Sequence, residues 1–149
     1  MRSAAAVADP WGTFGFSIKL QVRHPRRSTD DVSKALGIRP SRVVVAGEAR
    51  TTGAVAPLPG TYEESYCSLH LGTGTGRALE SRLRAATRKL RKHAALLRSW
   101  RRSGGTLAYY ITIHGEAAMG LALAPDLLLD IGRLGVELGI EALRARQRS

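Results

Sequence analysis

An unbroken alternation of apolar and polar residues near the start of the chain, TFGFSIKLQVR at residues 13–23, constrains the fold most strongly. Successive side chains of a β-strand point to opposite faces of its sheet. One face of this strand would carry only apolar side chains, namely those of Phe14, Phe16, Ile18, Leu20 and Val22. A strand with one apolar and one polar face predicts a sheet that other elements cover on one side only.

Beyond this strand the pattern switches between the period of two that is typical of strands and the period of about 3.6 that is typical of helices. Helices are predicted just before Gly37, at 77–102 and at 125–134, and strands at 42–48, 66–71, 106–114, 119–124 and 136–142. The segment 49–64 is rich in Pro and Gly and is predicted to be a loop.

This order of elements predicts an α+β fold with a mainly antiparallel sheet and helices packed on one face. The first six elements follow the βαββαβ order of the ferredoxin-like fold, and a C-terminal β-α-β extension follows them. With 149 residues, the chain is expected to form a single domain over 11–143, between a flexible tail at 1–10 and a basic tail at 144–149.

Cysteine content and hydropathy indicate where such a chain would reside. Its one cysteine, Cys67, excludes an intramolecular disulfide and a thiolate-rich metal site, and suits a reducing compartment. No apolar run approaches the ~20 residues of a membrane-spanning helix, and the one near the N-terminus is shorter than a signal-peptide core. We therefore expect a cytoplasmic protein that does not engage a membrane.

The net charge of +11 is concentrated on the predicted helix 77–102, which holds ten Lys and Arg residues and a single acidic one, Glu80. Helical spacing predicts a continuous cationic ridge opposite the apolar stripe, formed by Arg77, Arg84, Arg88, Arg91, Arg98 and Arg102. Such a ridge, ~35 Å long at 1.5 Å per residue, suits a phosphate backbone or an acidic protein surface. An ordinary solvated helix face is the alternative.

The stretch LHLGTGTGRAL at residues 69–79 has the outline of a phosphate-binding loop. A dinucleotide fingerprint requires a third glycine, but that position is Arg77 or Leu79 depending on the starting glycine. A flexible strand-to-helix connection is the expectation, in which the helix start and Arg77 hold one anion weakly at most.

The polar sides of the predicted strands form a second candidate surface. We expect one sheet face to carry Lys19, Arg23, Tyr66, His70, Tyr110 and His114, together with Glu137 and Glu141. Tyrosine and histidine suit a binding surface or a dimer contact. The solvated side of a sheet that is covered on one face is the alternative.

The sequence contains little that indicates catalysis. Cys67 and His70 are three residues apart on a strand and therefore point to opposite faces. The four histidines lack metal-ligand spacing, and no nucleophile elbow or metalloprotease helix is present. The sequence favours a protein that is not an enzyme, with no catalytic residues, metal or cofactor predicted.

Two segments carry a resemblance to a known family. ALGIRPSRVVVAGE at 35–48 and PDLLLDIGRLGVELGIEAL at 125–143 are similar to segments of the bacterial family called domain of unknown function 4279. Members often have a tryptophan at the start of the third strand, where this chain has Tyr66 or Cys67. The resemblance implies a small intracellular protein with an immunity-like or partner-binding role, and it implies no reaction.

The leading hypothesis is a non-enzymatic module, immunity-like or regulatory, that binds an acidic protein. One alternative is non-specific nucleic-acid binding through the arginine ridge of helix 77–102. Another is small-molecule binding or hydrolysis on the outer sheet face. A homodimer is also compatible with the sequence.

Overall fold

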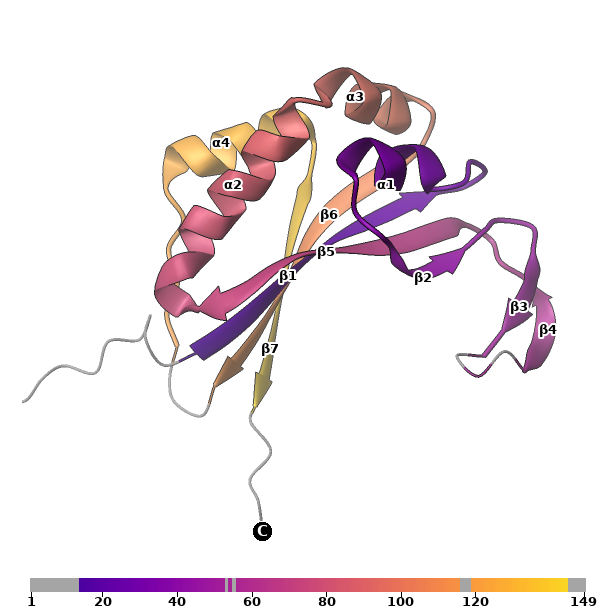
Figure 1. Ribbon diagram of the computed structural model, residues 1–149, viewed down its shortest axis with the longest axis horizontal. Helices are drawn as coiled ribbons and strands as arrows, with labels where there is room; N and C mark the ends of the chain where they lie inside the picture. Colours follow the sequence, from indigo (N-terminus) through magenta and orange to yellow (C-terminus); the bar gives the residue numbers. More distant parts are fainter. Residues whose placement is uncertain (1–13, 53, 55, 116–118, 145–149) are drawn as a thin grey trace, which may run out of the picture.

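The computed structural model describes residues 14–52, 54, 56–115 and 119–144. Its elements, labelled in Figure 1, are β1 (Phe14–His24), α1 (Asp30–Leu36), β2 (Ser41–Val44), β3 (Ala49–Thr51), β4 (Pro57–Thr61), β5 (Ser65–Thr75), the 3₁₀ turn η1 (Gly76–Ala78), α2 (Leu79–Arg91), α3 (Ala94–Arg102), β6 (Thr106–Gly115), α4 (Pro125–Leu134) and β7 (Glu137–Arg144). The tails predicted at 1–10 and 144–149 lie outside the described residues, except for Arg144 at the end of β7.

The chain has an α+β fold with a mixed five-stranded sheet in the order β2-β5-β1-β6-β7. Strand β1 lies antiparallel to both β5 and β6, and β2 is antiparallel to β5. Strand β7 is parallel to β6, because the chain returns through α4 to the end of the sheet where β6 began. The sheet is thus antiparallel except at its last pair of strands.

The apolar face of β1 forms the centre of the core, as its alternation predicts. All five apolar residues from Phe14 to Val22 at every second position are buried. Helices cover this face and contribute buried side chains such as Leu83 and Leu90 from α2, Trp100 from α3 and Ile131 from α4. Figure 1 shows α2 and α4 side by side over one end of the strands.

Two helices end as their glycines predict. Gly37 follows α1 with φ 66° and Gly135 follows α4 with φ 69°, a left-handed conformation in which a Cβ would be strained. In each case the glycine N–H donates to a carbonyl of the last helical turn.

The prediction of one continuous helix at 77–102 is wrong. The segment begins with the turn η1, and Lys92 and His93 separate α2 from α3. The sheet beneath twists, so a straight helix of this length would leave its surface. The break lets α3 turn, as Figure 1 shows, and bury both Leu97 and Trp100.

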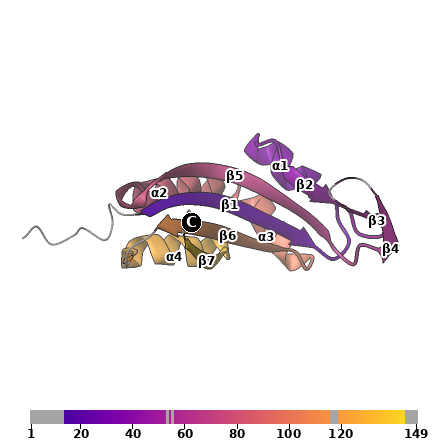
Figure 2. The same ribbon diagram turned by 90° about the horizontal axis from the view of Figure 1, so that it is seen from below.

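Two further segments differ from their predictions. Residues 119–124 form no strand; their alternation arises because Met119, Leu121 and Leu123 pack on the core while the backbone runs unpaired toward α4. Part of the predicted loop 49–64 is the hairpin β3–β4, which Figure 2 shows beyond the end of the main sheet. Its residues are exposed, so no apolar alternation marks it.

Candidate interaction surfaces

The helices α2 and α3 turn their cationic sides to solvent. Their buried positions include Leu79, Leu83 and Leu90 in α2 and Leu97 in α3, which places the intervening Arg and Lys residues outside. Of the ten cations between residues 77 and 102, nine are exposed and Arg84 is half-buried. This helical layer is the most strongly charged surface of the described chain.

Arg84 joins α2 to α4. Its guanidinium donates to both carboxylate oxygens of Asp126, at 2.8 and 3.0 Å, and to Glu80 Oε1 at 2.9 Å. These two carboxylates raise the pKa of Arg84, and Arg84 in turn lowers the pKa of Asp126. A planar guanidinium bound in this two-pronged way is not available to an external anion.

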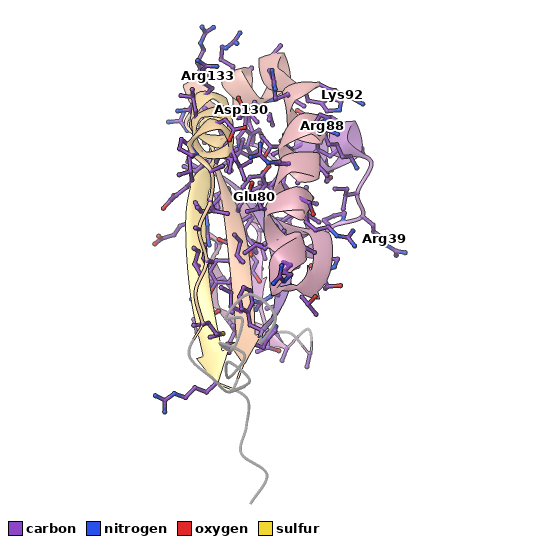
Figure 3. All side chains as sticks on the ribbon, turned by 90° about the vertical axis from the view of Figure 1, so that its left-hand side faces the viewer. Arg39, Glu80, Arg88, Lys92, Asp130 and Arg133 are labelled. Carbon is purple, nitrogen blue, oxygen red and sulfur yellow. The ribbon has the colours of Figure 1, made fainter. Side chains whose placement is uncertain are left out.

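The arginine ridge predicted from the sequence is therefore discontinuous. Arg91 lies 3.8 Å from Asp130 of α4, so two of the six ridge arginines face carboxylates of the same helix. The break between α2 and α3 interrupts the line again before Arg98. Figure 3 shows Asp130 on the side of α4 that faces α2, and Glu80 lies between the two helices.

Several cations of this layer form no ion pair within the described part of the chain. They are Arg82, Arg88, Lys89, Lys92, Arg98, Arg101 and Arg102. Figure 3 shows Arg88 and Lys92 on the side of α2 that faces away from α4. On α3, Arg98 and Arg102 line a hollow of about 470 Å³ together with Ala95, Ser99 and Ser103. The unpaired charge thus forms two groups, one on each helix.

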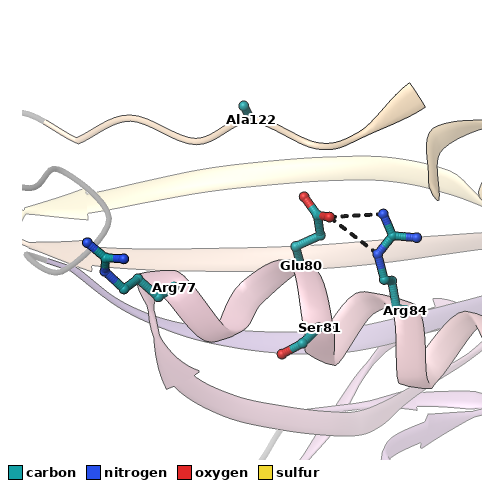
Figure 4. A pocket seen from close by; sticks show the side chains of 5 residues that line it. All are labelled: Arg77, Glu80, Ser81, Arg84 and Ala122. Atoms are coloured by element: carbon teal, nitrogen blue, oxygen red, sulfur yellow. Dashed lines mark hydrogen bonds and ion pairs between the residues drawn. The ribbon is translucent and has the colours of Figure 1, made fainter. Parts of the chain in front are cut away.

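A groove of about 450 Å³ lies between the start of α2 and the segment that leads into α4 (Figure 4). It is lined by Arg77, Glu80, Ser81, Arg84 and Ala122. The Glu80 carboxylate is held by Arg84, and the Ser81 hydroxyl donates to the carbonyl of Ala78 at 3.0 Å. No general base is placed beside Ser81 among the residues that line the groove, so its described geometry supplies no activated nucleophile.

The glycine tract forms the end of a strand and not a loop between strand and helix. Strand β5 continues through Thr75 and stays paired with β1, with one register shift at Leu71. This bulge turns Gly72 and Gly74 toward the helices, where a Cβ on Gly74 would lie only 2.9 Å from Phe16 Cζ. Gly74 is therefore explained by its close packing against Phe16.

The outer face of the sheet carries the second predicted surface. Strand pairing brings its residues together: Lys19 lies beside His70 and Tyr110, Arg23 beside Tyr66, and His114 beside Gly15. The Arg23 guanidinium stacks 4.6 Å from the Tyr66 ring centroid and also pairs with Glu64.

Tyr110 belongs to the same face and is also engaged. Its hydroxyl donates to Glu141, and this hydrogen bond raises the pKa of Tyr110. Lys19, His70 and His114 are exposed on the same face. The two tyrosines and Arg23 are thus occupied by contacts within the sheet.

His24 was not singled out from the sequence, yet it is the most buried histidine of the described residues. Its Nδ1 accepts from the backbone N–H groups of Arg26 and Arg27, so the proton resides on Nε2 and is donated to Ser103 Oγ at 2.9 Å. Burial, followed by the charges of Arg27 and Arg26, lowers the pKa of His24. Only the return of the chain at α3, 79 residues later, reveals this cluster.

Cys67 and His70 point to opposite faces of β5, as predicted: Cys67 is buried in the core, whereas His70 is exposed. Burial also raises the pKa of the Cys67 thiol, which disfavours the reactive thiolate. Within the described residues no cluster of three His, Cys, Asp or Glu side chains is placed to hold a metal ion. No helix in that part of the chain is both long and apolar enough to cross a membrane.

Comparison with known proteins finds no matching family model, no matching curated protein and no matching solved structure. The resemblance to domain of unknown function 4279 stays a prediction that rests on residues 35–48 and 125–143.

Proposed function

We propose that the protein is a cytoplasmic, non-enzymatic binding module that docks an acidic protein on the outer side of α2 and α3. The observation that supports this most directly is a group of exposed cations on these helices without ion-pair partners in the described chain, which includes Arg88, Lys89, Lys92, Arg98 and Arg102. Surfaces that serve only for solubility usually mix charges of both signs. Here the carboxylates lie between α2 and α4, so the side of α2 that faces away from α4 is cationic.

The arrangement of these charges favours a protein over a nucleic acid. A phosphate backbone presents evenly spaced charges and suits an uninterrupted cationic track. In this molecule Glu80 of α2 and Asp126 and Asp130 of α4 pair with Arg84 and Arg91, two of the six arginines of such a track. Two separate groups of cations instead suit carboxylates that a folded partner presents at separate positions.

We include in this proposal the ferredoxin-like interpretation of the first six predicted elements. The strand order β2-β5-β1-β6 with antiparallel neighbours supports it, and the hairpin β3–β4 would then be an insertion. An immunity-like or regulatory role accords with a charged surface and with described residues that bring no catalytic group together.

The test is a pair of charge reversals with equal net charge. Arg88→Glu with Lys92→Glu changes the outer side of α2, and Lys19→Glu with Arg50→Glu changes exposed cations elsewhere. We expect a fluorescent glutamate-rich peptide to bind the wild type in low salt. The first variant should weaken this binding at least about tenfold and the second by less than about threefold, because pairs at the site act at shorter range than the net charge.

The same variants are titrated with mixed-sequence DNA and RNA between about 50 and 200 mM salt. Nucleic acid that binds more tightly than the peptide, and in a way that Arg88→Glu with Lys92→Glu abolishes, would overturn the choice of a protein partner. Equal weakening of peptide binding by the two double variants would overturn the site itself.

A further inference from the structure

Strand β7 is an open edge of the sheet. It pairs with β6 along its whole length, from Glu137 beside Ala108 to Arg144 beside Gly115, without a register shift. No strand of the described chain lies on its other side. Edge strands of monomeric proteins are usually short, bulged or interrupted by proline or lysine. β7 has eight residues, no bulge, no proline and no lysine, so its outward N–H and C=O groups form a regular template.

Exposed apolar side chains gather on the same part of the molecule. Six large hydrophobic residues are exposed in the described chain, and four of them belong to α4 or β7. They are Leu128, Leu129, Ile140 and Leu143. Ile140 lies beside the buried Ile111 and so points to the helix-covered face, whereas Leu143 lies beside His114 and points to the outer face. Apolar groups therefore flank the open edge on both faces, which is typical of an interaction surface.

We propose that a second copy of this chain occupies the edge, with its β7 antiparallel to the first and Ile140 opposite Ile140 at the twofold axis. A twofold axis normal to the sheet keeps each face continuous across the two copies. On the helix-covered face this register places Leu138 opposite Ala142, so apolar residues meet along the strand. On the outer face it places Glu137 opposite Leu143 and Glu141 opposite Gly139, so no two carboxylates are opposed.

Charge also favours a copy docked at this edge over one docked elsewhere. The chain has a net charge of +11, but β7 itself carries two glutamates and one arginine, so two copies meet here with less cationic repulsion than on the outer sides of α2 and α3. Tyr110 holds the Glu141 carboxylate toward β6 and away from the edge. In the antiparallel arrangement Arg144 of each strand is opposite Val136 of the other, so neither arginine meets a second arginine across the contact.

The oligomeric state of the full chain tests the proposal, by sedimentation equilibrium up to concentrations on the order of 100 μM, where an interface of micromolar affinity is populated. We expect a dimer for the wild type. Ile140→Lys should raise its dissociation constant at least about tenfold, because two ammonium groups would face each other at the axis. Val43→Lys is the matched control, because Val43 on β2 and Ile140 are both 46% exposed. It should leave the dimer intact, and circular dichroism checks that both variants are folded.

An introduced cysteine tests the position of the contact without relying on the dissociation constant of the dimer. Opposed residues of an antiparallel pair have Cα atoms about 4.5–5.5 Å apart, within the range of a disulfide. Ile140→Cys should give a disulfide-linked dimer under mild oxidation, and Val43→Cys should not; the native Cys67 is buried. A monomeric wild type, an unaffected Ile140→Lys dimer, or a dimer that Ile140→Cys fails to cross-link would each overturn the proposal.

Discussion

Strands β2 and β7 form the two edges of the same sheet, and they differ in length, regularity and what precedes them. β2 has four residues, and its pairing with β5 is irregular between Ser41 and Val44. Pro40 precedes it, and Arg42 within it has φ 53°, outside the extended region of a strand. β7 has eight residues in continuous register with β6.

The difference shows how one edge strand of a sheet can be short and irregular while the other stays long and regular enough to pair with a further strand. β2 stops at Val44, short of the predicted strand 42–48, because the chain turns away and the Ala46 N–H donates to the Ser65 hydroxyl. β7 meets no such turn and is preceded by α4, whose buried residues anchor it to the core. We therefore expect the β7 side to contribute to stability and to association, and the β2 side to contribute little to either.

The largest effect should come from the anchor of the β7 side. Ile131→Ala in α4 removes a buried side chain and should lower the free energy of unfolding by about 2–5 kcal/mol. Val44→Ala, at the one half-buried position of β2, should lower it by less than about 1 kcal/mol. Urea denaturation measures both, and equal losses would contradict the contrast between the edges.

A smaller effect should follow from a buried side-chain pair that joins α2 to β6. The Thr87 hydroxyl and the Tyr109 hydroxyl are 2.9 Å apart, and burial raises the pKa of Tyr109 to about 12. Thr87→Val leaves the tyrosine hydroxyl without its partner and should cost about 1–3 kcal/mol of unfolding free energy.

The corresponding change on the β2 side is Ser41→Ala, which removes a long hydrogen bond of 3.3 Å to the carbonyl of Ser68. It should cost no more than about 0.5 kcal/mol. Combining Thr87→Val with Tyr109→Phe should recover part of the loss, because the unpaired hydroxyl is then absent. A further loss in the double variant would show that the hydroxyl pair is not what Thr87 supplies.

The last prediction concerns pH and has the smallest expected effect. The pKa of His24 is lowered in the folded protein. Its contribution to the free energy of unfolding is therefore fully present above the ordinary histidine pKa of about 6.5. Stability should fall as the pH drops below that value, because the unfolded chain takes up a proton that the folded chain, with Arg26 and Arg27 beside the ring, excludes.

Unfolding at pH about 7.5 and about 5.5 measures this effect. His24→Asn keeps a hydrogen-bond acceptor but does not titrate. It should reduce the difference in unfolding free energy between the two pH values, and an unchanged difference would assign the effect to another group.

The hydrogen-bonded pair of Arg84 and Asp126, near the β7 side, should lose its stabilising effect only at a lower pH. The lowered pKa of Asp126 means that its contribution is lost below the ordinary value near 3.8.

Some of the fold and of the candidate site could be predicted from the sequence, because it depends on local pattern. The alternation from Phe14 to Val22 identified the buried face of the central strand. The apolar stripe from Leu79 to Leu97 placed the cations of that segment outward. Gly37 and Gly135 marked helix ends, because a left-handed cap is a property of the residue itself.

What only the tertiary structure decided depends on residues far apart in the chain. The pairing of Arg84 with Asp126 spans 42 positions, and it divides a ridge that looks continuous in the sequence. The bulge at Leu71, which turns Gly74 toward Phe16, arises from the register between β5 and β1. The break at Lys92–His93 accords with the curvature of the sheet beneath the helix. Periodicity reports which side of an element is buried, but not the position along the partner at which it is buried, and that position is set by packing.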